Sequence, residues 1–213
     1  MDLTDLRIYM RSEETDGDTP VWQLVIDSAR QCGIVESRAI EGLLGVGSRG
    51  MIKPSNWVMQ RQIPVILDCR GSAESINAFI VNGLALHLRN GTAVSEAYGQ
   101  LDRGTIEAGL PNAATELGSM LRLNVGDTEN YEGTVLHEAI IHIVRGLGCA
   151  GATVYRGDDP NAENGLPLVI EVVDQPGAVA ELARCIGDIV DPDRIVSKQV
   201  AIVRWATNAV QPR

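Results

Sequence analysis

The stretch GCAGATVYRG, Gly148–Gly157, sets the folding pattern of the second half of the chain. A glycine at position 148 suits the residue that follows a helix, because glycine adopts left-handed backbone without strain. The small residues after it let a helix and a strand approach closely, and the β-branched run Thr153–Tyr155 is typical of a strand. The stretch therefore predicts the end of a helix, a tight connection and a strand.

Further elements follow outward from this stretch. Upstream, residues 121–125 read as a strand, and Thr134 is a candidate N-cap for a helix. That helix carries apolar residues at spacings of three and four: Leu136, Ala139, Ile140, Ile143, Val144 and Leu147. Downstream, residues 166–174 predict a strand, Pro176 begins a second helix, and residues 195–205 predict the last strand. The predicted order is β-α-β-β-α-β.

The first half of the chain repeats this pattern. At an offset of 115 residues several positions coincide: Leu6 and Arg7 with Leu121 and Arg122, Arg30 with Arg145, Gly33 with Gly148, and Gly42 with Gly157. At an offset of 103, Ile63–Pro64 coincides with Leu166–Pro167. The first copy, with Thr19 as the helix cap, therefore carries about 12 additional residues after Gly42.

Two such copies predict an α+β fold of two tandem ferredoxin-like (βαββαβ) units. Each unit would have its own antiparallel sheet with two helices on one face. The predicted boundaries are residues 1–100 for the first repeat, 101–118 for a connector and 119–213 for the second repeat.

Composition limits the classes of function. The 213 residues carry a net charge of −10 and no basic stripe, so we expect no binding to nucleic acid. No apolar run is long enough to span a bilayer, and the N-terminal residues do not resemble a secretory signal, so we expect a cytoplasmic protein. The four cysteines lack C-x-x-C spacing, which predicts free thiols rather than a metal site.

The order of elements around GATVYRG, together with the glycine-rich GLLGVGSRG of the first copy, resembles the PII-like family known as domain of unknown function 190. That family resembles the PII nitrogen regulators and the CutA proteins in fold. The resemblance implies a homo-oligomeric regulator that binds a small molecule, adenine nucleotides in the PII proteins. It also implies that a hairpin reports the ligand to a partner protein, for which a membrane transporter is one expectation.

The hairpin region after Gly42 is the candidate binding segment. Arg49, Lys53 and Arg61 lie in it, and there is no acidic residue between Glu41 and Asp68. Glycines allow backbone N–H groups to converge on an anion, and cations supply charge-assisted hydrogen bonds. We therefore predict that one group of residues binds an anion: Arg38, Gly45, Gly47, Arg49, Gly50, Lys53 and Arg156. The alternatives are a solvated loop or a docking surface formed by Met51, Trp57 and Met59. For Arg38 and Arg156 the alternative is a structural salt bridge.

Other motifs point away from catalysis and cofactors. Residues 45–50 match G-x-G-x-x-G, but Pro54 follows in place of a helix, so no Rossmann site is expected. His137 and His142 are five residues apart and would not share a helix face, and the acids of residues 158–164 lack EF-hand spacing. No nucleophile stands beside a base in the sequence. We expect no enzyme and no cofactor, and a ligand-free adaptor in a ring-like oligomer remains the alternative function.

Overall fold

The computed structural model describes residues 3–47, 50–53, 63–88, 90–95, 102, 104, 106, 114–157 and 166–206. The chain forms two compact units, and neither is one continuous segment. Unit 1 contains residues Met1–Ile40, Val65–Leu117 and Val200–Arg213, and unit 2 contains Glu41–Pro64 and Gly118–Gln199.

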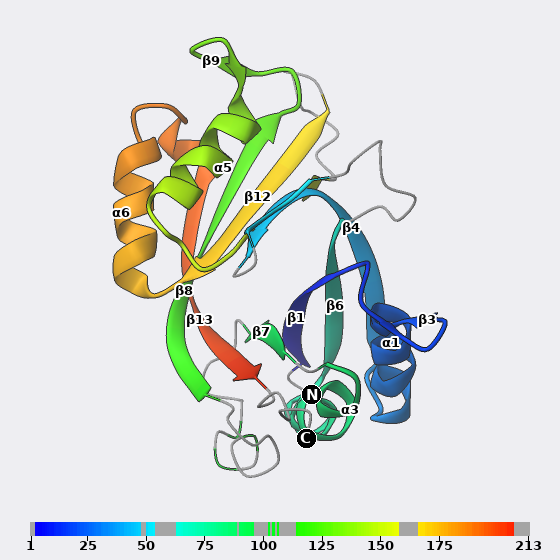
Figure 1. The fold of residues 1–213 in the computed structure, drawn as a ribbon. Coiled ribbons are helices and arrows are strands. Elements are labelled where there is room, and N and C mark those ends of the chain that lie inside the picture. Colours follow the sequence, from blue (N-terminus) through cyan, green and yellow to red (C-terminus); the bar gives the residue numbers. More distant parts are fainter. Residues whose placement is uncertain are drawn as a thin grey trace, which may run out of the picture. The chain divides into compact units, whose positions relative to one another are not determined.

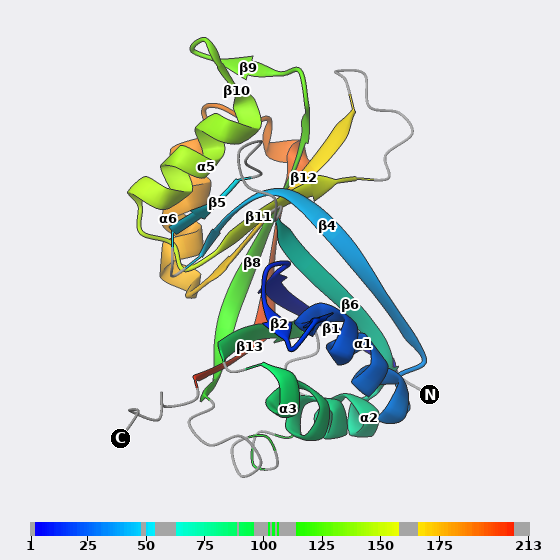
Figure 2. The same cartoon turned by 45° about the vertical axis from the view of Figure 1, so that its right-hand side comes forward.

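Unit 1 holds the first strand and the helices of the first half. Its elements are β1 (Leu3–Arg11), β2 (Thr15–Asp16), β3 (Thr19–Pro20), α1 (Val21–Gln31), most of β6 (Pro64–Ser72), α2 (Ala73–Ala78), the π-helix η1 (Phe79–Leu84), α3 (Ala85–His87) and β7 (Asn90–Ser95). Figure 2 shows α1 beside the helical segment formed by α2, η1 and α3.

Unit 2 holds most elements of the second half and the hairpin of the first half. Its elements are β5 (Gly50–Ile52), β9 (Asn130–Tyr131), β10 (Thr134–Val135), α5 (Leu136–Gly146), β11 (Ala152–Arg156), β12 (Pro167–Asp174), α6 (Pro176–Ile186) and η3 (Pro192–Arg194). Three strands are divided between the units, β4 (Glu36–Gly47), β8 (Ala114–Gly126) and β13 (Ile195–Ala206), and the first residue of β6, Pro64, also belongs to unit 2. Helices α5 and α6 lie side by side on one face of the strands of unit 2 (Figure 1).

The predicted fold class, two tandem ferredoxin-like (βαββαβ) units, is wrong. The long strands form one mainly antiparallel sheet in the order β11-β12-β8-β13-β7-β1-β6-β4-β5. Because β11 also pairs with β4, the eight strands from β11 to β4 form a closed ring of pairings, and the ninth strand of this described sheet, β5, lies outside the ring. Separate units would leave the N–H and C=O groups of β4, β7, β11 and β13 unpaired at sheet edges, and closure pairs them.

Closure also explains why these strands are buried on both faces. In β6, Val65 and Leu67 belong to the helix-facing core, yet Ile66 between them is 0% exposed. Val94 and Ile202 likewise alternate with core residues and are buried. Strands buried on both faces have nearly continuous apolar runs, as in PVIL and VAIV, rather than strict alternation.

Backbone hydrogen bonds determine where the first helix of each half, α1 or α5, begins. Thr19 and Thr134, predicted as N-caps, lie instead in β3 and β10, and α1 and α5 begin without a side-chain cap. The first backbone N–H group of each helix has no acceptor within the helix and donates instead to a hairpin carbonyl. Val21 donates to Glu14 and Leu136 donates to Glu129.

The prediction that glycine follows each of these helices is confirmed. Gly33 has φ 76° and Gly148 has φ 71°, both in the left-handed region. Each donates its N–H to the carbonyl of an arginine three residues earlier, at 3.1 Å. The glycines therefore satisfy helix carbonyls that would otherwise be unpaired.

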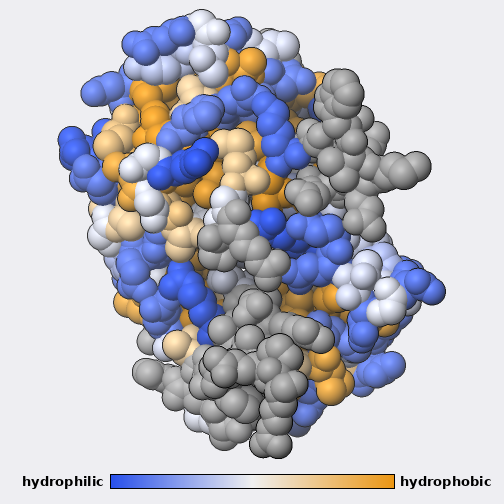
Figure 3. Space-filling model, in the orientation of Figure 1, coloured by the Kyte–Doolittle hydropathy of each residue, from blue (hydrophilic) through white to orange (hydrophobic). Residues whose placement is uncertain are grey.

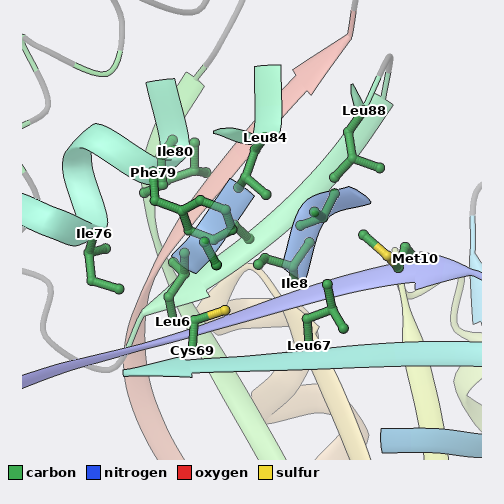
Figure 4. Packing of buried hydrophobic residues seen from close by; sticks show 14 of the residues in the cluster. Leu6, Ile8, Met10, Leu67, Cys69, Ile76, Phe79, Ile80, Leu84 and Leu88 are labelled. Carbon is green, nitrogen blue, oxygen red and sulfur yellow. The ribbon is translucent and has the colours of Figure 1, made fainter. Parts of the chain in front are cut away.

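The core of unit 1 is built where the helical segment crosses the strands. Ile76, Phe79, Ile80 and Leu84 point from α2 and η1 toward Leu6 and its neighbours on β1 and β6 (Figure 4). Phe79 is 0% exposed, and each such side chain contributes about 1.5–3 kcal/mol by leaving water. The close approach depends on Gly83, since a Cβ there would lie 2.5 Å from the Phe79 ring.

We predict that Gly83→Ala lowers the free energy of unfolding by about 1–3 kcal/mol, because Phe79 would have to move in a filled core. Gly146→Ala is the matched control: it also lies in a helix, nothing is within 4 Å of its added Cβ, and alanine is the better helix former by up to about 1 kcal/mol. Thermal unfolding of both variants tests this. Equal melting temperatures would contradict the packing argument.

Candidate functional site

The two glycine-containing signatures of the sequence lie on neighbouring strands of unit 2. Strand β11 carries ATVYR and pairs antiparallel with the end of β4, which carries GLLGVG. Ala152 is opposite Val46, Thr153 opposite Gly45 and Val154 opposite Leu44. The pairing brings the candidate residues Gly45, Gly47, Gly50, Lys53 and Arg156 into one unit.

The glycines of this region serve two different purposes. A Cβ on Gly45 would lie 2.9 Å from Cγ of Pro64 and 3.2 Å from the carbonyl oxygen of Ala152, so the fold itself requires glycine there. At Gly47 and Gly50 an added Cβ would meet nothing within 4 Å, and Gly50 has φ 98°. Gly47 and Gly50 form the last pair of the β4–β5 hairpin and leave its backbone open to approach.

Lys53 connects this hairpin to helix α5. Its Nζ donates a hydrogen bond of 2.8 Å to Oε1 of Glu138 in the first turn of α5. The side chains are 58% and 34% exposed, so both charges remain in contact with water. The hydrogen bond from Lys53 holds the pKa of Glu138 below its usual range. The carboxylate is therefore ionised at neutral pH.

His137 lies next to this ion pair. Burial lowers the pKa of His137, although the charges of Glu138 and Asp127 act in the opposite direction. Among the described residues no hydrogen-bond partner faces its buried Nδ1 atom. Among the described residues, the surroundings of this ion pair thus include the Asp127 carboxylate and the imidazoles of His137 and His142.

Arg156 ends strand β11 and is exposed. The β11–β4 register shifts between Val154 and Tyr155, so that Tyr155 is opposite Gly42. Such a bulge redirects side chains at the end of a strand. Arg49, Trp57, Met59 and Arg61 lie outside the described residues, and the structure places none of their side chains.

Arg38 belongs to unit 1, whereas the other candidate residues belong to unit 2. Its Nε and Nη2 donate to Oδ2 of Asp68 at 3.2 and 3.1 Å. Asp68 Oδ2 also accepts from Nη2 of Arg7 at 3.3 Å, and Nε of Arg7 forms an ion pair with Oδ1 at 2.8 Å. The Arg38 side chain is 59% exposed, and the Arg7 and Asp68 side chains are 16% and 18% exposed.

Unit 2 contains a more deeply buried charge group that the sequence reasoning missed. Arg122 donates to Oε1 of Glu171 through Nε and Nη2, at 2.9 and 2.6 Å, and the Tyr155 hydroxyl donates to the same oxygen at 2.9 Å. Glu171 is 1% exposed and is directly opposite Arg122 in the β8–β12 pairing. A signal existed: Arg122 matches Arg7 at offset 115, and Glu171 matches Asp68 at offset 103.

A serine and a histidine also meet in unit 1. Ser28 Oγ on α1 lies 3.0 Å from Nε2 of His87 on α3, so the search along the sequence for a nucleophile beside a base was incomplete. Ser28 is only 7% exposed, and a Cβ on Gly83 would lie 3.3 Å from its Cβ. The bond therefore joins two packed helices.

Within the described part of the chain, no group of three or more His, Cys, Asp and Glu side chains could hold a metal ion. No described helix is long and apolar enough to cross a membrane.

On the face seen in Figure 3, hydrophobic residues reach the surface around α5 and α6, where Leu147 is 39% exposed.

Comparisons with known proteins give a family and a weak structural likeness. The model of the DUF190 family, described as Uncharacterized ACR, matches residues 3–98 and 118–159, which is more than half of the chain. A crystal structure of a protein from Fusobacterium nucleatum, provisionally named a monooxygenase, is 10% identical with a TM-score of 0.26. That alignment covers 95% of this chain and 92% of the other.

The expectation that the chain is not an enzyme is withdrawn: it rested on a search along the sequence for a nucleophile beside a base, which missed Ser28 and His87, and the Fusobacterium protein carries the name of an enzyme. At this TM-score the likeness supports no argument about fold, and the name supports none about an activity of this chain.

We predict that the pKa of Glu138 rises toward its ordinary value of about 4.3 in Lys53→Met, because the hydrogen bond that lowers it is removed. A lowered pKa means that the stabilisation by this pair is present above the ordinary value and is lost as pH falls through the folded one. Carboxyl NMR titration of the unmodified protein and of Lys53→Met measures the two pKa values. Glu181, whose pKa is lowered by Arg184, is the internal control and should not change.

We predict that Glu171→Ala lowers the free energy of unfolding by about 3–5 kcal/mol, because it removes the acceptor of three hydrogen bonds from Arg122 and Tyr155. The double variant Arg122→Met/Glu171→Leu removes the charges together and should recover most of the loss. Urea unfolding measures both variants. Equal losses in the two would contradict a role for the uncompensated arginine.

Proposed function

The chain belongs to the DUF190 family, and we propose that it is a PII-like regulatory protein that binds a small anionic metabolite. An adenine nucleotide is the first ligand to test. Binding would be relayed to a partner protein through the β4–β5 hairpin, and a membrane transporter is the partner class that the resemblance suggests. Gly47, Gly50, Lys53 and Arg156 would form the described part of the site, with Arg49 beside them in sequence.

The observation that carries this proposal is the ion pair between Lys53 and Glu138. Both side chains are substantially exposed, and pairs of this kind contribute only about 0–1 kcal/mol to stability. A ligand anion of ordinary affinity can therefore compete with Glu138 for the ammonium group. The hairpin would be held to α5 in the absence of ligand and would change its contact when an anion binds.

Ligand binding would be relayed to the partner because Lys53 contacts Glu138 in the absence of ligand and the anion in its presence. A ligand shifts a conformational equilibrium only as far as its affinities for the two states differ. Lys53 supplies that difference, since its ammonium is bonded to Glu138 in one state and shared with the ligand in the other. The hairpin residues next to Lys53 would then be presented differently to a partner.

We also propose that the chain arose by tandem duplication, as the sequence offsets suggest. The hairpin strands β2 and β3 and the helix α1 have the bounds of β9, β10 and α5 at an offset of 115. Strand β6 begins at Pro64 and β12 at Pro167, an offset of 103. The pairs Arg7–Asp68 and Arg122–Glu171 follow both offsets. The family model also matches two separate segments.

Duplication with divergence would leave one anion site per chain. The segment that corresponds to the first hairpin in the second copy contains Asp158, Asp159 and Glu163, and it lies outside the described residues. Acidic residues there would repel an anion. Assembly into a homo-oligomer, as the resemblance implies, would multiply the number of sites by the number of chains.

We predict that calorimetric titration with ATP, ADP or AMP gives saturable binding that is weakened about tenfold or more in Arg49→Ala/Lys53→Ala, because two cations that contact the anion are removed. Arg184→Ala is the matched control: Arg184 is an exposed arginine on α6, paired with Glu181. Its affinity should equal that of the unmodified protein.

Two results would end the proposal. One is the absence of any heat at millimolar concentrations of all three nucleotides and of inorganic phosphate. The other is equal weakening of binding in the Arg184→Ala control, which would indicate nonspecific attraction of anions to the protein surface.

A further inference from the structure

The residues around Lys53 are of mixed charge, and this limits the ligands that fit. Lys53 Nζ lies 2.8 Å from Oε1 of Glu138, and the carboxylate is part of the first turn of α5. Asp127 is near enough to act on His137, the residue before Glu138. A group bound to Lys53 therefore lies beside at least one fixed carboxylate.

A purely anionic ligand would meet both signs of charge at once. An ammonium group has three donors, so Lys53 can contact a ligand oxyanion and Glu138 together. The ligand oxyanion and the Glu138 carboxylate would then be neighbours across one nitrogen, and like charges at such a separation repel. A positive centre on the ligand would turn this repulsion into attraction.

We infer that the natural ligand is zwitterionic: an oxyanion that binds Lys53, joined through a short linker to an ammonium group that binds Glu138. The inference rests on the proposed function and makes it more specific, because it assigns Glu138 a role in recognition as well as in holding the hairpin. Glu138 distinguishes a zwitterion from a simple anion of the same shape.

Two phosphate monoesters of nearly equal size test this directly. Phosphoethanolamine carries an ammonium group where ethyl phosphate carries a methyl group, so their affinities differ by the effect of that charge. We expect the unmodified protein to bind phosphoethanolamine about tenfold more tightly, the size expected when one attractive charge contact is added in an exposed site. Titrations contain EDTA, so that the positive centre is the ligand's own.

Glu138→Gln identifies the residue responsible. In this variant we expect the preference for phosphoethanolamine to fall to about twofold or less, and ethyl phosphate to bind more tightly than before, because the repelling carboxylate and the competitor for Lys53 are both gone. Glu181→Gln on α6 is the matched control, since Glu181 is also an exposed carboxylate paired with a cation. It should keep the tenfold preference.

The outcomes separate the two proposals. Equal binding of the two esters to the unmodified protein, or an unchanged preference in Glu138→Gln, overturns the zwitterion inference while nucleotide binding still supports an anion site. Nucleotide binding with neither ester bound also overturns the inference. If neither the esters nor the nucleotides bind, the proposed function itself has failed, and the inference fails with it.

Discussion

The pairing of β4 with β11 is the constraint on which the rest of the structure depends. It closes the ring of strands, and it joins the end of a first-half strand to a second-half strand within unit 2. Without it, both strands would expose a row of unpaired backbone groups. Position 45 requires glycine because this pairing and the Pro64 ring leave no room for a side chain on Gly45. The same pairing brings the glycine-rich hairpin next to the VYR strand.

Charged pairs on the face opposite the helices hold neighbouring strands in register. Arg122 and Glu171 are direct partners across β8 and β12, and a slip of one residue would turn both charges toward the helices. Arg7 and Asp68 form the corresponding pair in unit 1, with Arg38 as a third member. Buried pairs add little net stability, whereas a register in which the two charges no longer face each other would leave each of them buried without its partner.

The sequence allowed the elements to be predicted well, because apolar periodicity and the glycines at 33 and 148 depend on local geometry. The closed sheet could not be predicted in this way, since strand patterns do not specify which strand pairs at an edge. The continuous apolar run around Ile66 carried a signal that both faces are buried. In the candidate site, the sequence identified Lys53, but its partner Glu138 is 85 residues away in the chain and only the fold brings them together.

Strand β4 is continuous from Glu36 to Gly47, and its two ends belong to different compact units. Its 12 residues extend over roughly 36–40 Å at the usual rise per residue. An extended strand resists stretching, so a pull on the hairpin end is transmitted axially through covalent bonds toward Arg38. If a partner pulled on the hairpin, the backbone of β4 alone would carry the force to the other end of the strand, without a relay of side chains.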